Sequence, residues 1–213
     1  ERLVEQGCKY IHGPEIAPDG ENPERSSYSD VVLTERLRQA VSRINPTIPH
    51  DAQEQAIRAV LAAHAPELLA TNELFHRMLT DGVEFEYQHE GRTKGDKVWL
   101  VDFANPEANE FLVINQFTVI ENNVNKRPDL ILFINGLPLV VMELKNAVAE
   151  QATIRSAYEQ LQTYKNTIPS LFKYNGLLVA SDGLDARMGS LSAGFSRFMS
   201  WKTADGEEEA SHL

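Results

Sequence analysis

Cysteine, long apolar runs and excess positive charge are all scarce in this chain of 213 residues. The single cysteine, Cys8, excludes an internal disulfide, and no run approaches the roughly 18 apolar residues that a membrane span needs. A net charge of −11 argues against a protein that coats nucleic acid through many Lys and Arg contacts. The sequence also lacks a G-x-x-x-x-G-K-[ST] phosphate loop and an H-E-x-x-H zinc motif. What remains is a globular composition with enough apolar residues to bury a full core.

The apolar patterning predicts helices first and a sheet afterwards. Helical spacing marks 33–44, a stretch after residue 51, and 72–80, whereas strand-like runs occupy 83–87, 98–103 and 111–120. A hairpin follows, with apolar strands at 130–134 and 139–144 around the turn dipeptide Asn135-Gly136. A helix over about 153–168 and a buried strand at 177–180 complete the pattern. We therefore expect an α/β fold, a central mixed β-sheet flanked by helices with an N-terminal helical extension.

Three segments follow from this layout. Residues 1–110 form an N-terminal extension of helices and strands, 111–202 form the core, and 203–213 form an acidic linker. Because the chain begins at Glu1 without a methionine and closes on this polar segment, we expect it to be part of a longer protein.

Charged residues stand at one end of the predicted hairpin. Asp129 begins one strand, while Glu143 and Lys145 end the other, two residues apart and so on one face. A two-residue turn would place Asp129 across from Met142, whereas one further residue would place it across from Glu143, with Cβ atoms about 4.5–5.5 Å apart. If the acids are to grip one cation, the hairpin must contain an odd-length turn or a bulge.

Both faces of the hairpin are otherwise apolar, so we expect helices to cover both sides. Two carboxylates beside a buried sheet repel each other unless a cation is present, and carboxylate oxygens suit Mg²⁺. The expected chemistry is phosphodiester hydrolysis, with Lys145 orienting or deprotonating water or stabilising developing charge. Taken singly, Pro-Asp is a common turn former and Glu-Leu-Lys a common solvated strand end. Their combination across one apolar hairpin favours a metal site.

This combination resembles the signature of the PD-(D/E)XK nuclease superfamily. The longer string is similar to the N-terminal domain of the restriction (motor) subunit of type I restriction-modification enzymes, over about residues 28–201. The matching residues are Asn115-Gln116-Phe117, Arg127-Pro128-Asp129, Asn135-Gly136-Leu137-Pro138, Glu143-Leu144-Lys145-Asn146, and Gln160 with Tyr164 in a Gln-x-x-x-Tyr element.

The resemblance implies roles for these positions. Asp129, Glu143 and the backbone carbonyl of Leu144 would be metal ligands, Lys145 the catalytic lysine, and Gln160 and Tyr164 supporting or DNA-contacting residues. Without the resemblance, Tyr164 reads as a core aromatic and Gln160 as a helix-edge residue. A further acid from an earlier helix is common in such relatives, and Glu35 and Glu73 are the candidates.

The resemblance further implies a prokaryotic, cytoplasmic type I site-specific deoxyribonuclease that cleaves double-stranded DNA with Mg²⁺. Its partners would be modification (methyltransferase) and specificity subunits, with no membrane, and ATP would bind only in a translocase region of the full-length protein. A nuclease-like docking module that binds DNA or the motor without cutting is the alternative, since the net charge makes DNA affinity doubtful. A stand-alone nuclease or resolvase is a third reading, which the resemblance to the motor subunit disfavours.

Overall fold

A seven-stranded mixed sheet organises the computed structural model, which describes residues 2–89, 92–145 and 153–202. The strand order is β1-β4-β7-β8-β9-β10-β11. Strands β1 and β4 are parallel, as are β8 and β9, and the other neighbours are antiparallel. The bounds are Lys9–His12 (β1), Phe111–Asn115 (β4), Leu130–Ile134 (β7), Leu137–Leu144 (β8), Leu177–Ser181 (β9), Ala186–Gly189 (β10) and Met199–Ser200 (β11). The expected α/β fold with a mixed sheet is confirmed.

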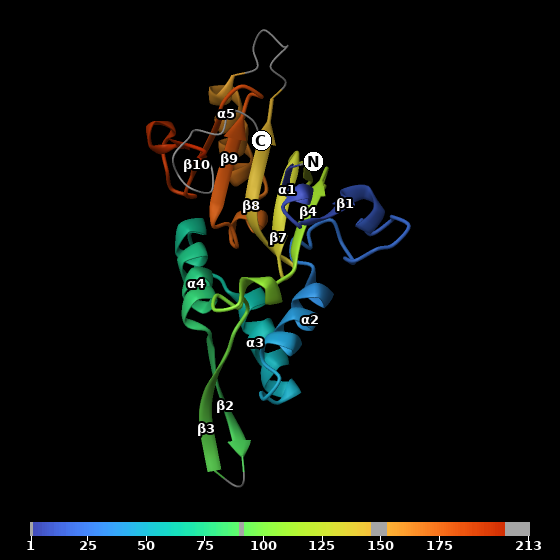
Figure 1. Cartoon of the computed structure of the whole chain (residues 1–213), viewed down its shortest axis with the longest axis vertical. Coiled ribbons are helices and arrows are strands. Elements are labelled where there is room, and N and C mark those ends of the chain that lie inside the picture. The colour runs from blue at the N-terminus through green and yellow to red at the C-terminus, as the bar shows by residue number, and fades with distance from the viewer. Residues whose placement is uncertain (1, 90–91, 146–152, 203–213) are drawn as a thin grey trace.

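Helices lie at one end of this sheet and on one of its faces (Figure 1). Helices α2 (Thr34–Ile44), α3 (His50–Ala62) and α4 (Leu68–Asp81) form the predicted N-terminal group, after the short α1 (Arg2–Glu5). Helix α5 (Ile154–Thr167) contacts β8 and β9, and α6 (Pro169–Phe172) follows it directly. None of the helices in the described ranges is long and apolar enough to span a bilayer.

Two small antiparallel ribbons lie outside the main sheet. Strands β2 (Val83–His89) and β3 (Arg92–Val98) project beyond the helices in Figure 1, and β5 (Val119–Glu121) pairs with β6 (Val124–Lys126). The strand expected at 98–103 is wrong, because β3 ends where that segment begins. There the Asn45 side chain bonds both the N–H and the carbonyl of Trp99, and Asp102 accepts bonds from the N–H groups of a tight turn. Side chains thus take the backbone bonds that a strand partner would need.

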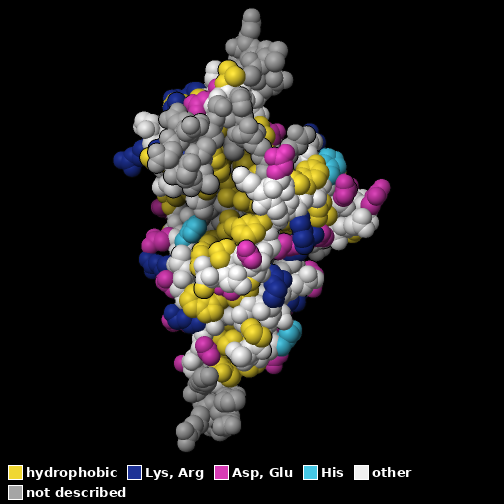
Figure 2. All heavy atoms as spheres, in the orientation of Figure 1, with side chains coloured by type: hydrophobic (Ala, Val, Ile, Leu, Met, Phe, Trp, Pro, Cys, Tyr) yellow, Lys and Arg dark blue, Asp and Glu magenta, His cyan; other side chains and the backbone are white. Residues whose placement is uncertain are grey.

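The two faces of the central hairpin are buried to different extents. Ile131, Phe133 and Val141 are fully buried on the face that α5 covers. Leu132 and Val140, on the other face, remain partly exposed. Figure 2, drawn in the orientation of Figure 1, shows hydrophobic side chains at the surface over the middle of the sheet. Of the described helices, α5 covers one face of the hairpin, whereas α2, α3 and α4 gather at the end of the sheet, so the expectation that helices cover both faces is not confirmed.

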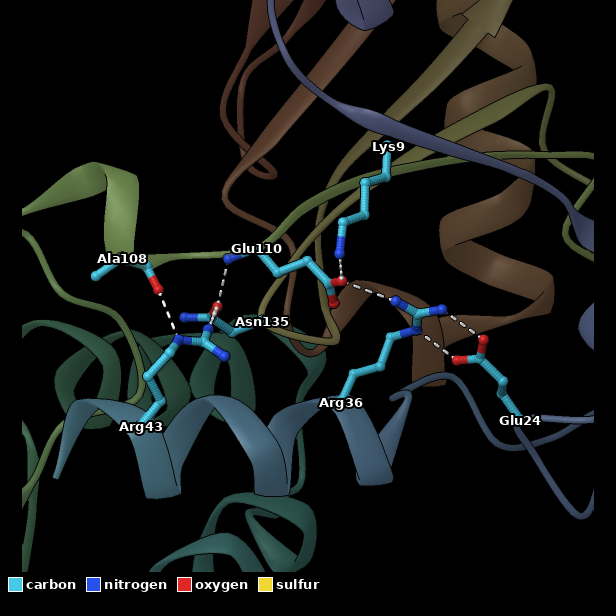
Figure 3. Close-up of polar contacts among 7 residues, drawn as sticks. All are labelled: Lys9, Glu24, Arg36, Arg43, Ala108, Glu110 and Asn135. Atoms are coloured by element: carbon cyan, nitrogen blue, oxygen red, sulfur yellow. Dashed lines mark hydrogen bonds and ion pairs between the residues drawn. The ribbon is translucent and has the colours of Figure 1, made fainter. Parts of the chain in front are cut away.

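An ion-pair cluster fastens α2 to the sheet (Figure 3). One carboxylate oxygen of Glu110, just before β4, accepts from Lys9 Nζ at 2.8 Å and from Arg36 Nη1 at 2.9 Å. Arg36, on α2, also donates two bonds to the carboxylate of Glu24, each 2.5 Å long. The cluster joins the N-terminal segment, the first long helix and the start of a central strand, so it fixes the helical group against the sheet.

The turn between β7 and β8 is buried under α2 and is held by side-chain bonds. Asn135, fully buried, donates through Nδ2 to the carbonyl of Leu100 at 2.9 Å and to Asn109 Oδ1 at 2.8 Å, and its Oδ1 accepts from the N–H of Glu110 at 2.8 Å. Its φ of 53° and the φ of 82° at Gly136 are both positive, as a two-residue type I′ turn requires. The Asn-Gly dipeptide therefore makes the predicted turn and also anchors it.

Candidate metal centre

A β-bulge in β8 brings the two predicted carboxylates to one face. Ile134 pairs with Leu137 across a two-residue turn, but Leu132 pairs with Val140, so that one extra residue, Leu139, lies on β8. Leu130 then pairs with Met142, which leaves Asp129 beside Glu143 in the register. The predicted need for an odd-length turn or a bulge is confirmed by the bulge.

Asp129 is held by the backbone on both sides of the hairpin end. Its carbonyl accepts from the N–H of Gln116 at 3.1 Å, and its Oδ2 accepts from the N–H of Leu144 at 2.8 Å. No hydrogen bond from the described residues reaches the other carboxylate oxygen, Oδ1. The side chain is thus aimed toward the end of β8 with one oxygen available.

Glu143 is a buried carboxylate, only 3% exposed. Its Oε1 accepts from Lys145 Nζ at 2.6 Å, whereas Oε2 is buried and has no hydrogen-bond partner among the described residues. Burial raises the pKa of Glu143, and the nearby Asp129 carboxylate raises it further, while Lys145 lowers it. A buried carboxylate with an oxygen left over is costly unless a cation or a proton compensates it.

Lys145 and Leu144 follow at the end of the strand. The Lys145 side chain is 28% exposed, so its ammonium bridges the buried carboxylate and solvent. Its backbone N–H donates to the carbonyl of Ser181 at 2.8 Å, which extends the pairing of β8 with β9. The predicted metal contact through the carbonyl of Leu144 stays a prediction.

Helix α5 brings the Gln-x-x-x-Tyr pair to the same place. Tyr164 is buried, and burial raises the pKa of its hydroxyl, as does the adjacent Glu143 carboxylate, while the Gln160 side chain lowers it. The structure therefore gathers Asp129, Glu143, Lys145, Gln160 and Tyr164. Their catalytic roles remain predictions.

The start of α5 is fixed in part by Asp182, which follows β9. Its Oδ1 accepts from the N–H groups of Leu184 and Asp185 in a turn, and its Oδ2 accepts from the N–H of Ile154 at 3.1 Å. A capping box between Thr153 and Ser156 adds to this start. Asp182 and Ile154 are 28 positions apart in the sequence, and no local pattern predicts their contact.

The two candidate extra acids lie elsewhere. Glu35 pairs with Arg38 at 2.6 Å on α2, and Glu73 pairs with Arg77 on α4. Within the described parts of the chain no three His, Cys, Asp or Glu side chains gather as a metal-binding group. Neither glutamate therefore joins Asp129 and Glu143.

One histidine lies at the same edge of the sheet without reaching the carboxylates. His12 Nδ1 is 2.9 Å from Asn115 Oδ1 at the ends of β1 and β4. Asn115 pairs with Leu130, whose side chain points to the face opposite that of Asp129. His12 and the two carboxylates therefore lie at the same end of the sheet but on opposite faces.

A central mixed sheet flanked by helices, with two acids and a lysine where neighbouring strands meet, places the chain in the restriction-endonuclease-like class of folds. Residues 1–197 match the family described as type I restriction enzyme R protein N terminus. The chain belongs to this family.

Two curated relatives match nearly the whole chain. The type I restriction enzyme HindI endonuclease subunit of Haemophilus influenzae is 40% identical over 214 residues, covering 100% of this chain and 20% of the relative. The putative type I restriction enzyme MjaIXP endonuclease subunit of Methanocaldococcus jannaschii is 36% identical over 212 residues, covering 98% of this chain and 20% of the relative. The chain thus spans about a fifth of the length of these relatives.

Proposed function

We propose that this chain is the nuclease domain of a type I restriction enzyme and cleaves double-stranded DNA endonucleolytically with Mg²⁺. The observation that carries the proposal is the convergence of Asp129 and Glu143, with the buried Glu143 Oε2 accepting no hydrogen bond from the described residues beside Lys145. Carboxylate oxygens are the ligands that Mg²⁺ prefers. The relatives named as endonuclease subunits support the same assignment.

The residues present fit such an ion. Asp129 Oδ1 and Glu143 Oε2 are the open donors, and the carbonyl of Leu144 is the predicted third. When bound, Mg²⁺ supplies a Lewis acid for the phosphate and a water of lowered pKa.

The other side chains position protons and charge. Lys145 holds Glu143 through Oε1, and its partly exposed ammonium can turn toward an attacking water or a phosphate oxygen. Tyr164 lies beside Glu143 and Gln160 beside Tyr164, so α5 contributes to the burial of the Glu143 carboxylate.

The activity of the longer protein is part of the proposal. By likeness to the R protein family, we infer that cleavage is coupled to ATP-driven translocation in a region outside this chain. Modification and specificity subunits would be the partners, and a prokaryotic cytoplasm the compartment. The division at residue 110 stays a prediction, and the proposed linker 203–213 lies outside the described residues.

A docking module that does not cut is the second candidate, favoured by the net charge of −11. Glu143→Ala and Lys145→Ala in the complete restriction complex distinguish the two. Loss of cleavage with normal translocation supports the nuclease, whereas preserved cleavage with normal translocation eliminates it.

Thermal melting with increasing Mn²⁺ or Mg²⁺ tests the site directly. The melting temperature of the wild type should rise with metal, because an ion that binds only the folded state stabilises it. Asp129→Ala should abolish the response, and Glu73→Ala, which removes an acid from the surface of α4, should keep it. An equal response in all three proteins would refute the site.

A further inference from the structure

We infer that the site takes one divalent cation, not two, because the ammonium of Lys145 fills the place of a second. This inference rests on the proposed function, since it concerns the metal bound by Asp129 and Glu143. It assigns Lys145 a role in setting the number of ions, apart from any role in proton transfer.

Two of the four carboxylate oxygens of Asp129 and Glu143 already accept a hydrogen bond. Asp129 Oδ2 is engaged by the N–H of Leu144 at 2.8 Å, and Glu143 Oε1 by Lys145 Nζ at 2.6 Å. Each carboxylate therefore has one oxygen that accepts no hydrogen bond from the described residues, and these two oxygens together can flank one ion. A pair of ions about 3.5–4 Å apart needs more donors, commonly a carboxylate that bridges them. Bridging through Glu143 would require Oε1, and so would displace Lys145.

The supply of further donors is the second argument. No third His, Cys, Asp or Glu joins the two acids within the described residues. Glu35 and Glu73 are each paired with an arginine on their own helix. Among the described residues, a second ion would thus find no further carboxylate, imidazole or thiolate ligand at the site.

The charge of the site is the third argument. Two carboxylates and one ammonium sum to a single negative charge, which one divalent ion reverses to a single positive charge. A second ion would leave three positive charges around a carboxylate that is 3% exposed, where water screens poorly. Repulsion among these cations opposes the second binding step.

A consequence follows for Lys145 itself. Its ammonium competes with metal for Glu143, so Lys145→Met should bind the first ion more tightly even though it removes the proposed catalytic lysine. Loss of one positive charge at contact distance should tighten binding by at least about tenfold. It also frees Oε1, so a second, weaker ion should enter. Lys145→Arg keeps the charge and should retain one ion with nearly wild-type affinity.

Calorimetric titration of the metal-free chain with Mn²⁺ at pH 8, without DNA, measures both the number of bound ions and their affinity. Lys173→Met is the matched control, because it removes the same charge at a different place. Lys173 follows α6 and precedes β9, whereas Lys145 lies beside the end of β9. Thermal melts show that each variant is folded, and counting bound Mn²⁺ by electron paramagnetic resonance checks the stoichiometry independently.

The expected result is one ion for the wild type, Lys145→Arg and Lys173→Met, and tighter binding with a second ion for Lys145→Met. Two ions in the wild type would overturn this inference and leave the metal-dependent function standing. Affinity in Lys145→Met that is unchanged or weaker would overturn the role given to Lys145. No Mn²⁺ bound by the wild type would remove the proposed function itself.

Discussion

Replacing Glu143 by Gln should stabilise the metal-free protein at neutral and alkaline pH. The carboxylate is 3% exposed, and one of its oxygens has no hydrogen-bond partner in the part of the chain that the structure describes. Burying such an ion costs several kcal/mol, and the charged hydrogen bond from Lys145 returns about 1.5–3 kcal/mol. The amide keeps the shape without the charge, so we expect a gain of about 1 kcal/mol, or ~2–4 °C in Tm for a domain of this size.

The pH dependence of this gain follows from the sign of the pKa change. Burial raises the pKa of Glu143 above its usual value. The folded state therefore favours the protonated form, and the wild type loses stability as pH rises from the unfolded pKa through the folded one. Glu143→Gln has no such loss, so its advantage should be near zero at low pH and grow across that window.

Chemical denaturation of both proteins in EDTA, at pH values from about 4 to 8, measures the difference in unfolding free energy. Saturating Mn²⁺ should reverse the order, because only the wild type then gains from binding. A Gln variant that is less stable than the metal-free wild type at pH 8 would refute the view that this carboxylate is held at a cost.

Three further changes test the turn and the helix beside the site. Asn135→Gly keeps the positive φ but removes four side-chain hydrogen bonds, three of them 2.8–2.9 Å long and one, from Arg43, 3.5 Å long, so denaturation should show a loss of about 3 kcal/mol; a loss under 1 kcal/mol would mean that the anchor is unimportant. Gly136→Ala would place a Cβ 2.5 Å from the carbonyl oxygen of Leu33 at a φ of 82°, and should cost more than about 2 kcal/mol; near-normal stability would contradict this packing. Tyr164→Phe removes a hydroxyl that lowers the pKa of Glu143, so the pH midpoint of Mn²⁺ binding should move upward; an unchanged or lower midpoint would separate the hydroxyl from the site.

The sequence predicts the residues of the candidate site in more detail than the elements around them. Asp129, Glu143 and Lys145 are marked by their places at the ends of apolar strands, and strand periodicity shows that they can share a face only if one residue is added. The sequence does not show which residue of the strand is the additional one. Leu139 is an apolar residue like its neighbours, and the bulge is selected by pairing on both sides of β8 together with the buried turn.

The environment of the hairpin was harder to predict because it depends on distant contacts. Apolar residues on both faces suggested helices on both sides, but α2 packs over the turn, where Gly136 leaves room for its first residues. Strand β1 also joins the sheet beside β4, across about a hundred residues of sequence. Local patterns carry periodicity, whereas which elements meet is decided by packing of the whole chain.

Because side chains alternate between the two faces of a strand, the number of residues between the turn and the site decides which face Glu143 occupies. A residue inserted or deleted between Asn135 and Glu143 would exchange inner and outer side chains up to the end of the strand, and turn the glutamate away from Asp129. A second such change in the same strand would restore the orientation. Paired changes in length should therefore be tolerated where single ones disable the site, even when both leave the fold intact.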